Sequence, residues 1–289
     1  MKSALDLPVP RSDTALMQYL QHLVGREGHR LWCGGTVPRK KFAAFVEKMA
    51  ARYPIARDTR GRAYDRKRGR AVVHFVVFPA GADAVSWWLL SSSGQGGLAD
   101  PASPDAHVAQ DAMSAASHIT HADYVLLYAT KTAAHAVTDA KSGKVRRFVK
   151  DTSTWTWKMR AEVVAQERAR IDRCCSALEY GAESGPDGKS PGWGLRGLLA
   201  ELRARPLFSG VRNQVIDLHR YARDAWSKQR GKWLERHPDY ARRYGQHAGQ
   251  LRPLNEVLAR RLPMMRRMKV FDSPALRIAD LVEGAPGKA

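Results

Sequence analysis

Four histidines are candidates for acid–base chemistry, because an imidazole can take up or release a proton near neutral pH. They are His29, His74, His118 and His121. A metal-independent endoribonuclease needs little more than such a group beside the ribose 2′-hydroxyl, with cations that stabilise the developing charge. His118 and His121 also have a spacing that could hold a metal, but neither an HExxH motif nor a CxxC pair is present. The sequence therefore does not select a catalytic residue, and it predicts neither a metal site nor a cofactor.

The densest group of cationic residues lies between positions 52 and 70, where only Asp58 and Asp65 oppose it. Gly61 and Gly69 interrupt this run, which predicts a basic loop or hairpin instead of a helix face. Arginine-rich loops follow the phosphates of a nucleic-acid backbone. The side chains expected to contact phosphates here are those of Arg57, Arg60, Arg62, Arg66, Lys67, Arg68 and Arg70.

A second basic group is expected on a helix that opens with LFSGVRNQV, residues 207–215. Ser209 can cap this helix, and the unpaired N–H groups of the first turn suit a phosphate. Asn213 and Gln214 lie where the residues of a recognition helix reach base edges. The basic side chains expected on one side of the helix are Arg212, His219, Arg223 and Arg230. The alternative is a solvated basic face on a core helix, and the sequence does not decide between the two.

Two tryptophans, Trp155 and Trp157, lie two residues apart in the strand-like stretch TSTWTWKM and would share one face of a strand. Beside Lys158 and Arg160, an exposed pair of tryptophans would form a stacking platform for single-stranded bases. Large aromatic side chains more often pack in a core, so burial of both rings is the alternative.

The charge of the chain is its most unusual bulk property. Among 289 residues, 48 Lys and Arg face 28 Asp and Glu, which gives a net charge of +20. Such a chain attracts polyanions, and nucleic acid is the favoured partner because each neutralised phosphate releases counterions. A genome rich in G and C would also raise the Arg content, whatever the function.

A membrane is the other common polyanion, and the sequence predicts no association with one. There is no run of about 18 apolar residues that could span a bilayer, and we expect no signal peptide. The three cysteines, Cys33, Cys174 and Cys175, are an odd number with an adjacent pair, which is a poor disulfide framework. These features predict a reducing compartment and a cytoplasmic protein.

The glycine-rich stretch SSSGQGGLAD, residues 91–100, lacks the GxxxxGK[ST] pattern of a phosphate-binding loop. The chain also has no kinase motif set and no GxSxG motif. We therefore expect neither an ATPase nor a hydrolase of small esters.

Hydrophobic periodicity predicts an α+β protein. Helices are expected over the first 55 residues, with Ser12 as an N-cap and a turn at Gly34 and Gly35. A mostly antiparallel sheet follows, with a short helix at 105–118 and strands at 71–78, 86–91, 124–129, 145–149 and 152–159. Helices are expected next, at 160–181, 195–205, 209–230, 238–247 and 254–262. This pattern predicts an α+β domain (1–182), a linker (183–192), a basic all-helical domain (193–280) and a frayed tail (281–289).

Three of these stretches, SWWLLSSSGQGGL, TSTWTWKM and LFSGVRNQV, resemble a set of proteins encoded on proteobacterial plasmids and integrative conjugative elements. The resemblance spans roughly residues 87–223. It implies a mobile-element context and carries over no catalytic residue. The basic α+β character is also similar to that of the CRISPR RNA-processing endonucleases, but their glycine-rich loop near the C-terminus is not evident here.

The leading hypothesis is a nucleic-acid-binding protein that holds the phosphate backbone within a plasmid, mobile-element or antiviral-defence nucleoprotein machine, together with other protein subunits. A metal-independent RNA endonuclease that retains its product is the first alternative. A structural subunit whose positive surface binds an acidic protein partner is the second. The sequence does not distinguish RNA from DNA.

Overall fold

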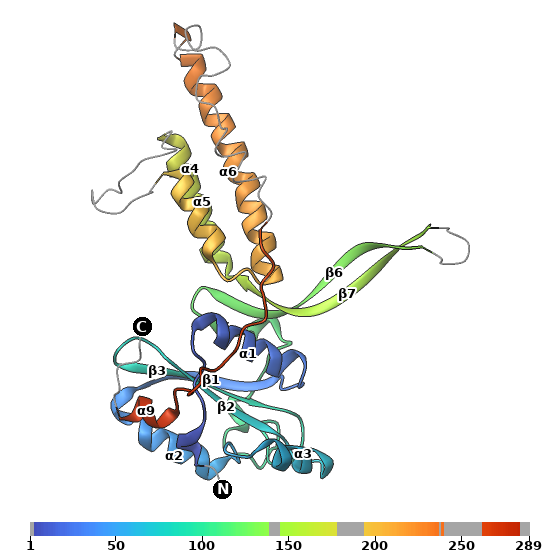
Figure 1. Cartoon of the computed structure of the whole chain (residues 1–289), viewed down its shortest axis with the longest axis vertical. Helices are drawn as coiled ribbons and strands as arrows, with labels where there is room; N and C mark the ends of the chain where they lie inside the picture. The colour runs from blue at the N-terminus through green and yellow to red at the C-terminus, as the bar shows by residue number, and fades with distance from the viewer. Residues whose placement is uncertain (1–2, 139–144, 178–193, 237, 240–261, 284–289) are drawn as a thin grey trace. The chain divides into compact units, whose positions relative to one another are not determined.

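The computed structural model describes residues 3–138, 145–177, 194–236, 238–239 and 262–283 (Figure 1). The chain has the predicted α+β class, with helices and two sheets. It divides into two compact units that interleave along the sequence: residues 1–121, 126–156 and 267–289 form the first, and residues 122–125 and 157–266 form the second. This division differs from the predicted boundary at residue 182, which lies with its linker outside the described residues.

The first unit is built on a four-stranded sheet in the order β2-β3-β1-β4. Its antiparallel strands are β1 (Leu31–Pro38), β2 (Val73–Pro79), β3 (Ala84–Ser91) and β4 (Gln110–Asp111). The predicted hairpin is confirmed as β2 and β3, because β-branched and aromatic residues fill both strands. The second sheet has the order β5-β6-β7 and comprises β5 (Ile119–His121), β6 (Tyr124–Thr138) and β7 (Val145–Met159).

Strand β1 was not expected, because Gly34 and Gly35 predicted a turn. They lie instead in the middle of the strand, opposite Trp88 and Trp87 of β3. A Cβ atom at Gly34 would lie 2.7 Å from the carbonyl oxygen of Trp87, which is too close for any side chain. Glycine is therefore required at Gly34 by the close approach of two strands and not by a turn.

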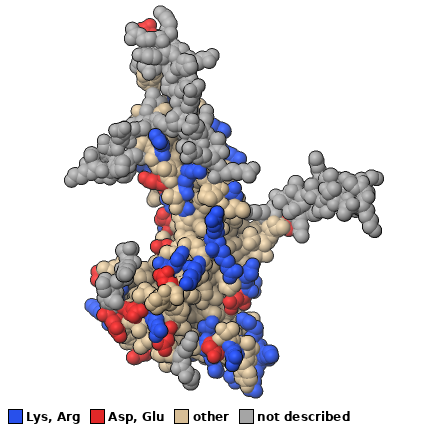
Figure 2. Space-filling model, in the orientation of Figure 1, with Lys and Arg blue, Asp and Glu red and all other residues tan. Residues whose placement is uncertain are grey.

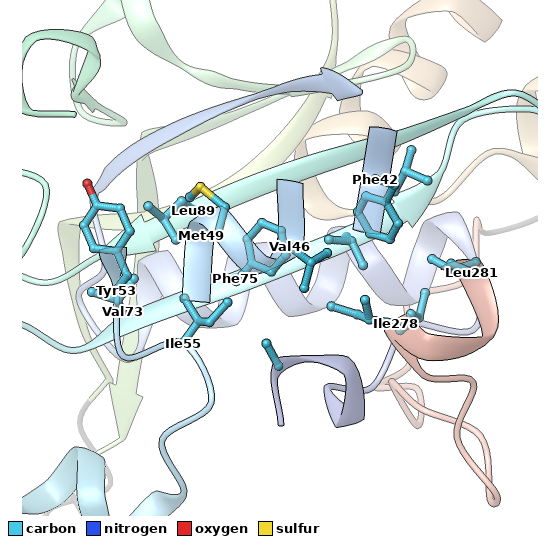
Figure 3. Packing of buried hydrophobic residues seen from close by; sticks show 14 of the residues in the cluster. Phe42, Val46, Met49, Tyr53, Ile55, Val73, Phe75, Leu89, Ile278 and Leu281 are labelled. Atoms are coloured by element: carbon cyan, nitrogen blue, oxygen red, sulfur yellow. The ribbon is translucent and has the colours of Figure 1, made fainter. Parts of the chain in front are cut away.

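Helices cover both faces of this sheet (Figure 1). They include α1 (Asp13–Gly25), α2 (Phe42–Arg52) and α9 (Ile278–Val282), with the 3₁₀ turns η1 (Ala4–Asp6) and η2 (Arg39–Lys41). Ser12 caps α1 as predicted, since its side chain accepts a hydrogen bond from the backbone of Ala15 at 3.3 Å. Side chains of α2, α9, β2 and β3 form one buried apolar cluster (Figure 3). The helix α1 lies on the opposite face of the sheet.

Helix α9 corrects the prediction of a frayed tail for residues 281–283, and the rest of that tail lies outside the described residues. Ile278 and Leu281 are 1% exposed and belong to the cluster of Figure 3. The backbone of this segment also pairs with the first residues of the chain, because Ile278 donates a hydrogen bond to Leu7 and Val9 donates one to Leu276. An apolar segment of only five residues is too short for helical periodicity to predict a helix.

The helix predicted at residues 105–118 is wrong. Only the 3₁₀ turns η3 (Ala106–Val108) and η4 (Ala115–Ser117) form there, on either side of β4. The Asp111 side chain accepts a hydrogen bond from the backbone of Met113 at 2.9 Å, which is a turn that competes with a helix. The segment also has no apolar stripe to bury, so nothing compensates for that competition.

The described part of the second unit contains α4 (Ala161–Ser176), α5 (Leu195–Ala204) and α6 (Ser209–Arg236), with α4 packed against α6. These helices agree with the predicted periodicity. The all-helical C-terminal region is not confirmed, because residues 262–277 contain no helix and most of 238–261 is outside the described residues. None of the helices in the described ranges is long and apolar enough to cross a bilayer.

An ion-pair network around one buried carboxylate joins α4 to the end of α5. Glu167 of α4 is 4% exposed and accepts hydrogen bonds from Arg205, just after α5, and from Arg170 at 3.0 Å. The other terminal nitrogen of Arg205 donates to Asp123 at 3.1 Å and to the Tyr124 hydroxyl at 3.3 Å. A buried carboxylate is tolerated here because guanidinium groups satisfy both of its oxygens.

We expect Glu167→Ala to lower the free energy of unfolding by about 3–5 kcal/mol, because it leaves part of the Arg205 charge buried without its partner. Urea unfolding followed by circular dichroism measures the change. Gln166→Ala, at an exposed position of the same helix, should change the stability by no more than about 0.5 kcal/mol. Equal effects of the two substitutions would contradict this role of the network.

Candidate nucleic-acid interface and a buried histidine pair

The basic run forms a helix, α3 (Thr59–Lys67), and not the predicted loop or hairpin. Asp58 is the N-cap, and its side chain accepts a hydrogen bond from the backbone of Gly61 at 2.7 Å. This cap offsets the cost of a glycine in the first turn. Asp is a favoured N-cap residue, so Asp58 was a sequence signal for the start of a helix. The glycines of this run led to the prediction of a loop instead.

One buried carboxylate organises the arginines at the two ends of α3. Asp65 is 4% exposed, and its oxygens lie 3.3 Å from Nε of Arg57 and 3.7 Å from Nη1 of Arg70. The remaining cations around α3 are exposed, apart from half-buried Arg62, and Figure 2 shows Lys and Arg gathered in the region of this helix. Within the described residues, no carboxylate pairs with Arg60, Arg66 or Lys67.

The glycine-rich stretch holds the end of α3 in place. Gln95 forms a parallel bridge with Arg70, accepts a hydrogen bond from the backbone of Ala71 at 2.9 Å and donates one to Gly69 at 3.1 Å. A Cβ atom at Gly94 would lie 2.7 Å from the Ala71 nitrogen and 2.8 Å from the Gly69 oxygen. The glycines of this stretch therefore allow two backbones to approach, a structural role that requires no nucleotide.

The second group of predicted contacts lies in the second unit. Arg160, Asn213 and Arg223 are exposed there, and Lys158, Arg212 and Arg230 are half-buried. Arg223 forms an ion pair with Asp224 at 3.2 Å, which offsets part of its charge. Fewer of the predicted contacts are exposed here than around α3.

Two residues of α6 that were predicted to contact nucleic acid, Gln214 and His219, form contacts inside the protein instead. The Gln214 amide accepts a hydrogen bond from the Met159 nitrogen at 2.7 Å and donates one to its oxygen at 3.0 Å, so it is not available to a base edge. His219 is 5% exposed, and burial together with the charge of Arg203 lowers its pKa to about 4. A buried neutral imidazole does not hold a phosphate, so the prediction for His219 is wrong.

Trp155 and Trp157 are both buried, which was the alternative prediction from the sequence. Trp155 is 8% exposed and its ring contacts Tyr128, whereas Trp157 is fully buried and contacts Phe208. They therefore do not form the predicted stacking platform. An exposed aromatic ring is found on α3 instead, where Tyr64 is 49% exposed and the guanidinium carbon of Arg68 lies 4.5 Å from the ring centroid.

Two of the four candidate histidines come together. His29 follows α1 in a turn, and His74 is the only polar residue in the buried part of β2. Their rings pack edge to face with centroids 4.6 Å apart, and both are almost fully buried. The exposed Glu27 lies beside them, with its Oε2 3.7 Å from Nε2 of His74. The sequence did not single out Glu27, although a histidine inside an apolar strand is an unusual feature that indicates a role.

Neither histidine of this pair is suited to acid–base catalysis. Burial, with the charges of Arg62 and His29, lowers the pKa of His74 to about 2, and burial lowers the pKa of His29 from its ordinary value. A reacting phosphate also could not reach rings that are 0% and 4% exposed. His121 lies elsewhere, with Nε2 2.8 Å from the Asp13 carboxylate, and His118 is half-buried. Among the described residues, neither belongs to a group of three or more potential metal ligands.

Comparison of the chain with protein-family models, with curated protein sequences and with solved structures gave no match. The functional reading therefore depends on the geometry of the described residues.

We expect Gly94→Ala to destabilise the first unit by about 2–4 kcal/mol, because it combines backbone strain with a steric clash. Gly96→Ala is the matched control: its φ of +74° is also positive, but nothing lies within 4 Å of the added Cβ. That variant should lose only about 1–2 kcal/mol. Thermal unfolding of the two variants tests the difference, and equal losses would show that the close approach at Gly94 is unimportant.

Proposed function

We propose that this protein binds the phosphate backbone of a nucleic acid through α3. The observation that carries the proposal is the set of exposed cations on this helix, which lack acidic partners among the described residues. Asp65 neutralises only Arg57 and Arg70, at the two ends of the helix. A row of cations without nearby carboxylates is unfavourable by itself and is stabilised when phosphates approach it.

Rigid placement supports the same proposal. The N-cap at Asp58 and the bridge between Arg70 and Gln95 fix both ends of α3. Cationic side chains on a fixed helix lose less conformational freedom on binding than those of an unstructured loop. The proposal includes the context that the resemblance implies, a nucleoprotein assembly of a plasmid or other mobile element in the cytoplasm, with other protein subunits. The basic surface around α6 would supply further phosphate contacts.

The triple variant Arg60→Ala, Arg66→Ala, Lys67→Ala should bind nucleic acid more weakly, with a slope of log K against log salt that is smaller by about 2–3. Fluorescence anisotropy with labelled single-stranded RNA, single-stranded DNA and duplex DNA measures this. The control removes three exposed cations elsewhere in the same unit, Lys40→Ala, Lys41→Ala, Lys48→Ala, with the same change in charge. Equal losses in both variants would assign binding to net charge, and no binding by the wild type would reject the proposal.

Tyr64 tests whether bases also contribute. If its exposed ring stacks on a base, Tyr64→Ala should weaken binding to single strands by about 1–3 kcal/mol, since stacking provides energy of that size. Tyr64→Phe keeps the ring and should bind as the wild type does. Duplex binding should be nearly unchanged in both variants, because paired bases are not open to stacking. A loss that is equal for single strands and duplex would argue against stacking.

A further inference from the structure

We propose that Glu27, His29 and His74 form a binding site for a divalent transition-metal ion, zinc in particular. One ligand atom from each residue lies within 4.8 Å of those from the other two. Ligand atoms at the bond lengths of tetrahedral zinc are about 3.3–3.4 Å apart. The separation of 3.7 Å between His74 Nε2 and Glu27 Oε2 is already close to that value. Binding of one ion requires the three ligand atoms to move from within 4.8 Å of one another to this shorter spacing.

Each of the two histidines presents a buried ring nitrogen without a hydrogen-bond partner. Nε2 of His29 and Nε2 of His74 are buried and have no hydrogen-bond partner. The other nitrogen of His29, Nδ1, lies 3.3 Å from the carbonyl oxygen of Leu23 and donates its proton there, so Nε2 carries the lone pair. Leaving two buried polar atoms unsatisfied is costly. A metal ion bound by both would remove that cost.

Neighbouring groups orient the ligands as they do in known metal sites. The Leu23 carbonyl fixes the tautomer and ring position of His29, and His22 Nε2 lies 3.2 Å from Oε1 of Glu27. This contact leaves Oε2 of Glu27 directed toward His74. Metal-bound histidines and carboxylates commonly have such outer-shell hydrogen bonds.

Ligand chemistry selects the class of ion. Two imidazole nitrogens and one carboxylate favour zinc and related transition metals over Mg²⁺ or Ca²⁺, which prefer oxygen ligands. Three protein ligands leave a position for water, on the side where Glu27 is exposed. The positive charges of Arg62 and Arg66 act on both rings and oppose a cation. We therefore expect weaker binding than in sites with thiolate ligands.

The test uses the full chain, without a polyhistidine tag and freed of nucleic acid by nuclease treatment. We expect one zinc per chain by competition with a chromophoric chelator, and tetrahedral visible bands when Co²⁺ is substituted. Zinc at about 100 times its dissociation constant should raise the melting temperature by roughly 5–10 °C. Absence of zinc binding by the folded wild type would overturn the proposal.

Variants then locate the ion. Glu27→Gln changes an exposed ligand without disturbing the core, so it should keep the metal-free melting temperature and lose affinity by more than the ~10–100-fold of an outer-shell change. His22→Ala removes a positioning residue and should weaken binding by about 10–100-fold while the tetrahedral Co²⁺ spectrum persists. Glu47→Gln, on α2, is the matched control and should bind as the wild type does. Equal affinity of Glu27→Gln and wild type would place the ion elsewhere and overturn the assignment.

Discussion

Burial of β2 on both faces is the constraint on which the first unit depends. Val73, Phe75 and Val77 point into the cluster shared with α2 and α9, while His74 and Val76 point toward the side of α1. Each buried apolar side chain contributes about 1.5–3 kcal/mol, so together they outweigh the roughly 1–3 kcal/mol cost of one unsatisfied imidazole. The strand therefore folds with the His74 side chain buried.

The same strand links the interior to the charged surface. Residues 70–72, which connect α3 to β2, form hydrogen bonds with the glycine-rich stretch, and Ser92 donates a further one to the Val72 carbonyl. The cations of α3 therefore extend from a segment whose backbone is fixed by the sheet. Asp65 compensates Arg57 and Arg70, at the two ends of the helix, and leaves the exposed cations between them to the solvent. This short helix therefore has one buried, paired carboxylate and several exposed cations.

The parts of the fold with a strong local pattern were predictable. The hairpin of β2 and β3, the Ser12 cap and the periodic helices α4, α5 and α6 follow from short-range sequence signals. The prediction failed where a distant contact decides the structure. Gly34 is needed by a neighbouring strand and not by a turn, and the short apolar segment of α9 forms a helix only against a core made by other segments.

The residues of the candidate sites were also predictable only where the sequence pattern is local. Clustering of the cations between positions 52 and 70 is a local property and could be read from the sequence, although their helical arrangement could not. The pairing of His29 with His74 joins a turn and a strand, and no motif spacing encodes it. The burial of Trp155, Trp157 and His219 depends on packing partners that are remote in sequence. Residue type alone therefore did not predict which of these side chains are buried or which lie together.

Pairing of residues 7–9 with residues 276–278 has a consequence for biosynthesis. Strands β1 to β4 leave the ribosome early, but the apolar surface that α9 covers stays open until residues 278–282 emerge. At a synthesis rate of about 5–20 residues per second, that delay lasts on the order of 10–30 s. During this time the apolar surface that α9 covers in the finished first unit stays open to other apolar partners.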